Sequence, residues 1–194
     1  QTENGETNVA TNFSDVNPDA WYAPYVNALV AEGIIKGYED NTFRPQNNIN
    51  RAEFCKIMEA IAPEATEKKE VSFSDVKEGS WYYDAVMYMA ENGYIQGYED
   101  NTFKPQANIT RAEISTILTN VYGDLGGKGS TTFSDVKEGS WYYDAVMNLA
   151  KAGYINGFSD GTFKPNDNAT RAQSAKMVYV AENGGKVLLN DVKN

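Results

Sequence analysis

The chain has 194 residues and a net charge of −10, and 41% of its residues are hydrophobic and 12% aromatic. This apolar content is enough for a folded core, and the acidity argues against nucleic acid or an anionic membrane surface as the main partner. The chain has no histidine and a single cysteine, Cys55. Serine–histidine and cysteine–histidine catalytic pairs, histidine zinc sites and an internal disulfide are therefore excluded. No apolar stretch is long enough to suggest a membrane span.

One segment occurs three times in the chain, with a spacing of 60 residues. Each copy starts with Phe-Ser-Asp-Val and continues to a tryptophan, and these are all the tryptophans of the chain: Trp21, Trp81 and Trp141. The predicted organisation is a flexible N-terminus, three repeats with linkers between them, and a tail: 1–12, 13–61, 73–121, 133–181 and 182–194. Such a period indicates a repeat protein.

Each repeat is predicted to fold as a helix, a loop and a second helix. The first helix is expected to begin near the tryptophan, with Asp19, Ser80 and Ser140 as N-caps. Gly33 and its copies suit the left-handed position that follows a helix end. Cys55, which aligns with a serine and an alanine, is predicted to be a buried helix residue rather than a reactive thiol.

The loop of the first copy, residues 37–45, has Asp-Asn at its centre, which predicts a tight turn between short extended arms. Pro45 predicts that Arg44 before it is extended. The turn is acidic, but it lacks the ligand spacing of a calcium loop. We therefore predict neither a metal site nor a cofactor.

The second helix of each repeat begins with the pattern of a capping box. The pairs predicted to support the cap are Asn50 with Glu53, Thr110 with Glu113, and Thr170 with Gln173. One such repeat is too small to bury much surface alone. The predicted fold is therefore mainly α, a pseudo-threefold bundle of three repeats that share one core, with up to three similar grooves between adjacent repeats.

Three of the four arginines of the chain, Arg51, Arg111 and Arg171, occupy the first position of these second helices. A cation there opposes the helix dipole at a cost of up to about 1 kcal/mol, so the repetition suggests a function. A guanidinium fork beside free helix amides would bind a carboxylate or phosphate. The alternative is an internal ion pair, with Asp15 or Glu53 or their copies as the partner.

Two further repeated positions are candidate ligand contacts. The aspartates of the Phe-Ser-Asp-Val motif could accept hydrogen bonds from sugar hydroxyls: Asp15, Asp75 and Asp135. The three tryptophans are interpreted as core or groove-wall residues, with stacking on a sugar as the alternative. The loop aromatics Tyr38, Tyr98 and Phe158 are interpreted as turn-packing residues.

The motif from Phe-Ser-Asp-Val through Gly-Tyr-Ile-Gln-Gly-Tyr-Glu-Asp-Asn-Thr-Phe-Lys-Pro to Ile-Thr-Arg-Ala-Glu resembles the S-layer homology (SLH) domain. The resemblance covers about residues 13–181, and three tandem copies are the usual arrangement of that family. It implies a three-pronged pseudo-trimer, which agrees with the shared core. The family's Thr-Arg-Ala-Glu motif is complete at Thr110–Glu113 and carries one change in each of the other copies, at Asn50 and Gln173.

The resemblance implies a non-catalytic anchor in the bacterial cell wall or S-layer, fused to a larger surface protein. Many members bind secondary cell-wall polysaccharide that carries ketal-linked pyruvate, and others bind modified peptidoglycan. The preferred hypothesis is that Arg51, Arg111 and Arg171 hold the pyruvate carboxylate, and that replacing all three by alanine leaves the fold intact. The competing hypothesis is a self-assembly module with structural arginines. An enzyme is disfavoured because every candidate carboxylate pair occurs three times.

Overall fold

A computed structural model describes residues 13–188; the predicted flexible N-terminus and the end of the predicted tail, residues 189–194, lie outside the described residues. The elements are α1 (Ala23–Ala31), α2 (Arg51–Glu59), α3 (Tyr83–Glu91), α4 (Arg111–Tyr122), α5 (Tyr143–Lys151) and α6 (Arg171–Glu182). Between residues 13 and 188, extended pairing is limited to three isolated bridges. The predicted mainly α fold is confirmed.

The second helices α2, α4 and α6 begin where the capping boxes predict. In α2 the Asn50 side chain accepts a hydrogen bond from the Glu53 amide at 2.8 Å, while the Glu53 carboxylate accepts one from the Asn50 amide. The other two boxes close in the same way. Gln173 therefore caps α6 as the glutamates cap the other two helices.

The first helices begin two residues later than predicted, and the N-cap prediction is wrong. Helix α3 has Tyr82 at its N-cap with no side-chain hydrogen bond, and Tyr22 and Tyr142 occupy the N-caps of α1 and α5 in the same way. Ser80 takes part through its backbone instead, because its carbonyl accepts a hydrogen bond from the Tyr83 amide at 3.1 Å. A turn thus precedes the helix and separates the Ser80 hydroxyl from the first helical amides.

The loop differs from the prediction at Arg44, which is left-handed with a φ of 58° rather than extended. The cause is Asp15, whose two carboxylate oxygens accept hydrogen bonds from the amides of Phe43 and Arg44, both at 2.8 Å. Two successive amides can point at one carboxylate only if the backbone bends there. The left-handed conformation costs about 1–2 kcal/mol, which the two charge-assisted hydrogen bonds offset. Gly33 is left-handed as predicted, with a φ of 75°.

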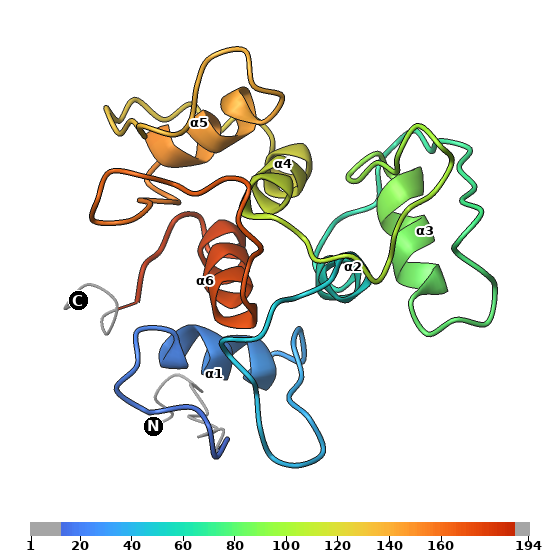
Figure 1. Cartoon of the computed structure of the whole chain (residues 1–194), viewed down its shortest axis with the longest axis horizontal. Helices are drawn as coiled ribbons and strands as arrows, with labels where there is room; N and C mark the ends of the chain where they lie inside the picture. Colours follow the sequence, from blue (N-terminus) through green and yellow to red (C-terminus); the bar gives the residue numbers. More distant parts are fainter. Residues whose placement is uncertain (1–12, 189–194) are drawn as a thin grey trace, which may run out of the picture.

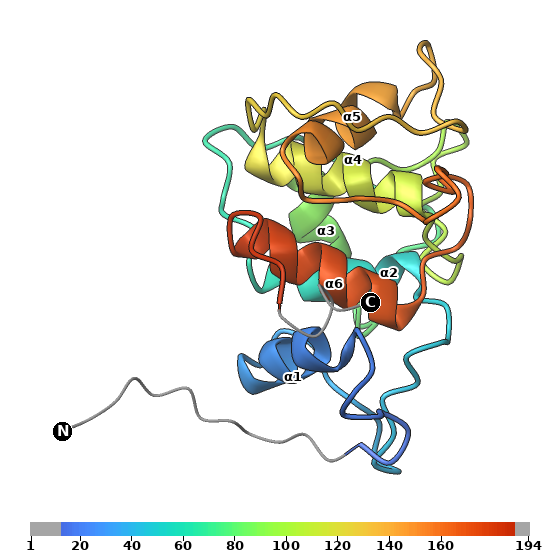
Figure 2. The ribbon, with the colours of Figure 1, turned by 90° about the vertical axis from the view of Figure 1, so that its left-hand side faces the viewer.

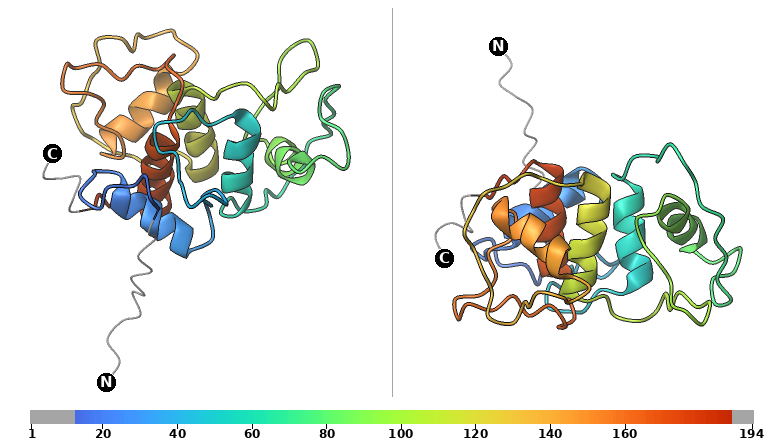
Figure 3. Two further views of the ribbon diagram at one scale, coloured as in Figure 1. Left: turned by 60° about the horizontal axis from the view of Figure 1, so that its bottom comes forward. Right: turned by 90° about the horizontal axis from the view of Figure 1, so that it is seen from above.

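The second helices α2, α4 and α6 lie together in the middle of the molecule, and the first helices lie outside them (Figure 1). Each first helix packs against the second helix of the preceding repeat, so that α3 lies on α2 and α5 on α4. Helix α1 packs on α6 and so closes a ring between the first and the last repeat (Figures 2 and 3). Each packed pair of one first helix and one second helix therefore comes from two different repeats, which the sequence alone did not indicate.

A closed ring of backbone hydrogen bonds joins the three repeats. The Ile49 amide donates to the Ala169 carbonyl, the Ile109 amide to the Ile49 carbonyl, and the Ala169 amide to the Ile109 carbonyl, at 2.9–3.2 Å. All three residues are fully buried. The pseudo-threefold arrangement is thus fixed by main-chain contacts as well as by the shared core.

Two general predictions can be compared with the described residues. Cys55 is fully buried as predicted, and burial raises the pKa of its thiol to about 12, which makes it unreactive at neutral pH. None of the helices between residues 13 and 188 has the length and apolar character needed to cross a bilayer.

Candidate functional site at the repeat junctions

Each repeat arginine lies at a junction between two repeats. The Arg51 Nε donates a hydrogen bond to the Phe103 carbonyl at 2.9 Å, and Arg111 donates in the same way to Phe163 at 2.8 Å. Arg171 donates to Phe43 at 2.8 Å and so connects the last repeat to the first. The three arginines are only 3–7% exposed. Their guanidinium groups therefore belong to the junction as well as to any ligand site.

The helix N-termini do not supply the free amide groups that the sequence predicted. The Arg51 amide donates to the Ala107 carbonyl and the Ala52 amide to the Pro105 carbonyl, at 2.9 and 3.0 Å. The Glu53 amide is used by the capping box. Contacts of the same kind satisfy the first amides of α4 and α6. The prediction of an anion site on helix amides is wrong, because the neighbouring repeat caps each helix, and any anion site here depends on side chains.

An aromatic ring lies under each repeat arginine. The Arg51 guanidinium carbon is 5.0 Å from the Tyr98 ring centre, and Arg111 and Arg171 are 4.8 and 4.9 Å from the rings of Phe158 and Tyr38. A second cation from the turn lies over each of the same rings, 3.8–4.3 Å from its centre. These aromatics are therefore junction residues. Their recurrence at the repeat spacing was the sequence signal for this role.

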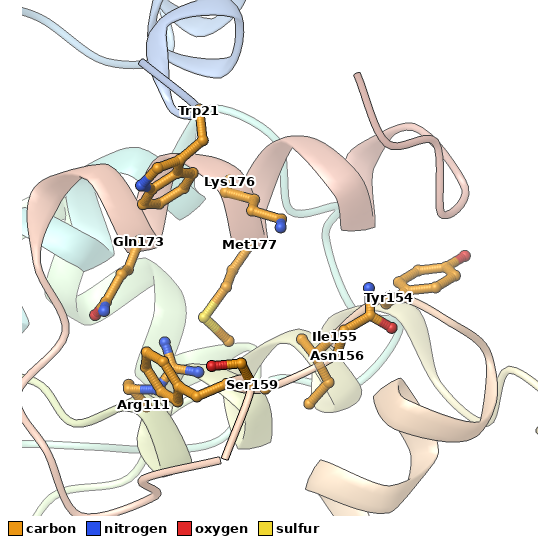
Figure 4. Close-up of a pocket in the computed structure, with 11 residues that line it drawn as sticks. Trp21, Arg111, Tyr154, Ile155, Asn156, Ser159, Gln173, Lys176 and Met177 are labelled. Atoms are coloured by element: carbon orange, nitrogen blue, oxygen red, sulfur yellow. The ribbon is translucent and has the colours of Figure 1, made fainter. Parts of the chain in front are cut away.

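A pocket of about 360 Å³ surrounds Arg111. Its lining includes Phe158, Gln173, Lys176 and Met177 from the third repeat and Trp21 from the first. Figure 4 shows Arg111 and Trp21 at opposite ends of the pocket, with Met177 between them and Gln173 at one side. A planar cation, an aromatic wall and a thioether thus face one cleft.

The equivalent pocket beside Arg171 has a volume of about 570 Å³ and is built from the corresponding positions. Trp81 lines it and is 57% exposed, and Glu53 and Lys56 stand where the first pocket has Gln173 and Lys176. By the same equivalence Trp141, which is 66% exposed, belongs to the junction of Arg51. The predicted arginine and tryptophan residues are therefore brought together, and Trp81 and Trp141 are not core residues.

The three arginines differ in their other partners. Arg51 also donates to the Gln96 carbonyl at 2.9 Å and forms a buried ion pair with Glu113. Arg171 donates to the Lys36 carbonyl at 2.8 Å and lies 3.7 Å from the Glu53 carboxylate. The alternative of an internal ion pair is thus correct for these two. Their partner is the capping glutamate of the next repeat, not Asp15.

Arg111 has fewer partners than its two equivalents. Across residues 13–188 its side chain makes one hydrogen bond, from Nε to the Phe163 carbonyl, and no ion pair. Burial lowers the pKa of Arg111 to about 10, although the Asp167 and Asp135 carboxylates act in the opposite direction. The side chain therefore remains charged at neutral pH while its charge is incompletely compensated.

The motif aspartates are not in the lining of either arginine pocket. Asp75 and Asp135 accept hydrogen bonds from two successive turn amides, as Asp15 does. Both oxygens of each carboxylate are thus used to hold the turn on which the junction aromatic sits. This position gives the aspartates a structural role, and their contact with sugar hydroxyls stays a prediction.

The aspartate at the centre of each acidic turn accepts hydrogen bonds from within the turn itself. Hydrogen bonds from the threonine two residues later lower the pKa of Asp40, Asp100 and Asp160. Within the described part of the chain, no three acidic or cysteine side chains lie close enough together to hold a metal ion.

The fold and the junction pockets define a class of protein, a closed ring of three α-helical repeats with ligand-sized clefts at its junctions. Comparison with known proteins identifies the family. The S-layer homology domain matches residues 12–55, 72–114 and 132–175, and the chain belongs to this family.

Among curated proteins, the chain is 34% identical to an amylopullulanase of Thermoanaerobacterium thermosulfurigenes over 90% of its length. It is 35% identical over 74% of its length to a cellulosome-anchoring protein of Acetivibrio thermocellus, and 36% identical over 81% to cell surface glycoprotein 1 of the same organism. The matches cover 10%, 34% and 8% of these proteins, so the chain spans about a third of their length or less. The family and these relatives indicate an extracellular location at the cell wall or S-layer.

Proposed function

We propose that this chain is a non-catalytic module that anchors a larger surface protein to the bacterial cell wall. Its ligand is a secondary cell-wall polysaccharide, bound at the repeat junctions through the carboxylate of a pyruvate ketal. Family membership supports the anchoring role, as does the similarity to a cellulosome-anchoring protein. The small part of the amylopullulanase that is matched gives no reason to extend its activity to this chain.

The pocket beside Arg111 is the observation that carries this proposal. A pyruvate ketal presents a fixed carboxylate next to an apolar methyl group on a sugar ring. Arg111 offers a planar fork of donors for the carboxylate, a geometry that lysine lacks. Trp21 and Met177, which line the same pocket, offer apolar surface for the methyl group and the sugar face. The volume of about 360 Å³ lies in the range of small-ligand sites.

An acidic protein can bind an anionic polymer because the contact is local. The net charge of −10 acts at long range, and salt screens it beyond about 8–10 Å. Lys176 and Arg111 line the pocket, and no carboxylate lines it. One site of this kind is weak, but a polymer with many ketals keeps the effective ligand concentration high near the protein. This arrangement suits an anchor, which needs a long residence time.

Calorimetric titration tests the proposal, with matched wall polysaccharide in its native form and after chemical removal of pyruvate. We expect binding to the native polymer only, and a loss of at least about tenfold in affinity for Arg111→Gln. Lys137→Gln is the matched control, because it removes one charge at an exposed residue that lines neither arginine pocket.

Three results would contradict this function. Equal binding to both polymers would assign recognition to the sugar backbone. Binding to purified peptidoglycan instead would identify a different wall ligand. Oligomers that form without glycan, together with no binding to either polymer, would favour a self-assembly module.

A further inference from the structure

The three junctions of this protein are not equivalent carboxylate sites. We infer that the last residue of each capping box decides which junction binds: Gln173 leaves Arg111 available for a carboxylate, whereas Glu113 and Glu53 occupy Arg51 and Arg171. The Arg111 pocket is then the primary carboxylate site. This inference rests on the proposed function and concerns its distribution among the junctions.

The capping glutamates have two roles at once. One oxygen of Glu113 accepts hydrogen bonds from the amide and hydroxyl of Thr110, and the other pairs with Arg51. The Arg51 side chain is 4% exposed and that of Glu113 19% exposed, so the pair is largely shielded from water. A ligand carboxylate at this junction must first displace the carboxylate of the protein itself. Glu53 has the same two roles toward Asn50 and Arg171, with a longer ion pair of 3.7 Å.

Gln173 can perform only the first of these roles. Its carbonyl oxygen accepts a hydrogen bond from the Thr170 amide at 3.1 Å, so the remaining polar atom of its side chain is the amide nitrogen. That nitrogen is a donor, and a guanidinium is also only a donor. The cap of α6 is thus kept, while Arg111 gains no internal carboxylate partner.

The loop of the third repeat contributes a second difference. Gly157 is left-handed with a φ of 72°, whereas its equivalents Gly37 and Gly97 are not in the left-handed region. In the other two repeats, the residue just before the equivalent glycine supplies a carbonyl that accepts a hydrogen bond from a repeat arginine. Gln96 does so for Arg51, and Lys36 does so for Arg171. A changed glycine conformation reorients that peptide group, and Arg111 makes no such bond within residues 13–188. One sequence change, at Gln173, and one difference in loop conformation, at Gly157, therefore leave the terminal nitrogens of Arg111 for a ligand.

The charges that line the two pockets also favour carboxylate binding at Arg111 over Arg171. Arg111 and Lys176 line the first pocket without a carboxylate. The second contains Arg171 and two lysines, but also Glu53 and Glu59. At the junction of Arg51, the position of Lys176 is taken by Thr116, which removes a cation. The attraction for a ligand carboxylate is therefore greatest at Arg111.

The three tryptophans make each junction observable by itself. Trp21 lines the Arg111 pocket and Trp81 the Arg171 pocket, and Trp141 holds the equivalent place near Arg51. The indole N–H signals can be followed in a two-dimensional NMR titration after assignment by single Trp→Phe variants. The probe is a methyl glycoside that carries one pyruvate ketal, and its control is the same glycoside with the ketal carboxylate esterified. A monosaccharide probe excludes avidity.

We expect the Trp21 signal of the unmodified protein to move at the lowest probe concentration, and the other two at concentrations at least about tenfold higher. Gln173→Glu should weaken the Trp21 response by about tenfold or more. Glu113→Gln should strengthen the Trp141 response, and Glu53→Gln the Trp81 response. Gln173→Glu and Glu113→Gln each create a capping pair that this chain already uses. Glu53→Gln keeps a side-chain oxygen to accept the hydrogen bond of the Asn50 amide. The helices should therefore stay intact, as circular dichroism would verify.

The outcomes separate this inference from the proposed function. Three indole signals that move together, or a Gln173→Glu variant that binds like the unmodified protein, would refute the unequal junctions while carboxylate binding stands. An equal response to the esterified probe would refute carboxylate recognition itself. Carboxylate recognition would also be refuted if no indole signal moved in any variant, either with the monosaccharide or with the native polymer.

Discussion

Replacing the repeat arginines one at a time should give unequal losses of stability, with Arg51→Ala the most damaging and Arg111→Ala the least. All three side chains are buried and each holds one carbonyl of the next repeat. Arg51 additionally holds the Gln96 carbonyl and the Glu113 carboxylate, whereas Arg111 holds neither equivalent. The expected order follows from the groups that each substitution leaves without a partner.

The magnitudes can be worked out from these contacts. Loss of one hydrogen bond from a charged donor to a buried carbonyl costs about 1.5–3 kcal/mol, and this part is common to the three variants. Removing one member of a buried ion pair costs about 3–5 kcal/mol, and the 19% exposure of Glu113 lowers this toward about 2 kcal/mol. We therefore expect a loss of about 2 kcal/mol for Arg111→Ala and at least about 4 kcal/mol for Arg51→Ala, because the lost bond to the Gln96 carbonyl adds to the lost ion pair. Arg171→Ala should lie between them, because its ion pair is longer.

Urea denaturation followed by far-ultraviolet circular dichroism measures the difference. A gap of about 2 kcal/mol also corresponds to roughly 4–8 °C in Tm for a chain of this size. Equal losses for the three variants would refute the reasoning, as would a greater loss for Arg111→Ala than for Arg51→Ala. The expectation that all three arginines can be removed without damage to the fold is not retained, because two of them have internal carboxylate partners.

Three further changes test the structure away from the pockets. Asp75→Ala should lower the free energy of unfolding by about 2–4 kcal/mol, since two turn amides lose a charged acceptor. Thermal melting measures the loss, and a loss no greater than that of the exposed control Glu78→Ala would contradict the prediction. Gly97→Ala should destabilise strongly, because its Cβ would lie 2.4 Å from the Phe73 ring and 2.6 Å from a backbone oxygen; a normal Tm would contradict this. Burial and the nearby Glu32 carboxyl raise the pKa of Glu182. Protonation of Glu182 therefore favours the folded state, and its contribution to stability falls as the pH rises through its folded pKa. Glu182→Gln should accordingly be more stable than the unmodified protein at neutral pH, with a smaller difference near pH 4; equal stability at both pH values would contradict it.

The sequence predicted the local structure best where one residue and its near neighbours determine the outcome. The capping boxes form as predicted because Asn50 and Glu53 are only three positions apart and satisfy each other. The left-handed Gly33 is likewise a local requirement of the helix end. The repeat period predicted the shared core, since one repeat cannot bury enough apolar surface alone.

Predictions failed where the deciding contact came from another part of the chain. Arg44 is not extended because Asp15, distant in sequence, binds its amide. The amide of Arg51 is not free because the loop of the next repeat supplies the Ala107 carbonyl. No local pattern contains either contact. The packing of α1 on α6 is also invisible to a reading of one repeat, because it follows from closure of the ring.

The same closure explains why the arginine position combines stability and binding. Two nitrogens of Arg51 are held by carbonyls and the third pairs with Glu113. A junction whose arginine pairs with a capping glutamate therefore gains stability at the expense of affinity for a ligand carboxylate. In a ring of three junctions these needs can be divided among the copies. Glu113 and Glu53 stabilise two junctions, while Gln173 retains the helix cap without neutralising Arg111. An incompletely compensated charge is tolerated at a single junction because the backbone ring and the other two arginines still join the repeats. On this reasoning Gln173→Glu should raise stability as it weakens binding, a pairing of effects that a change in packing alone would not produce.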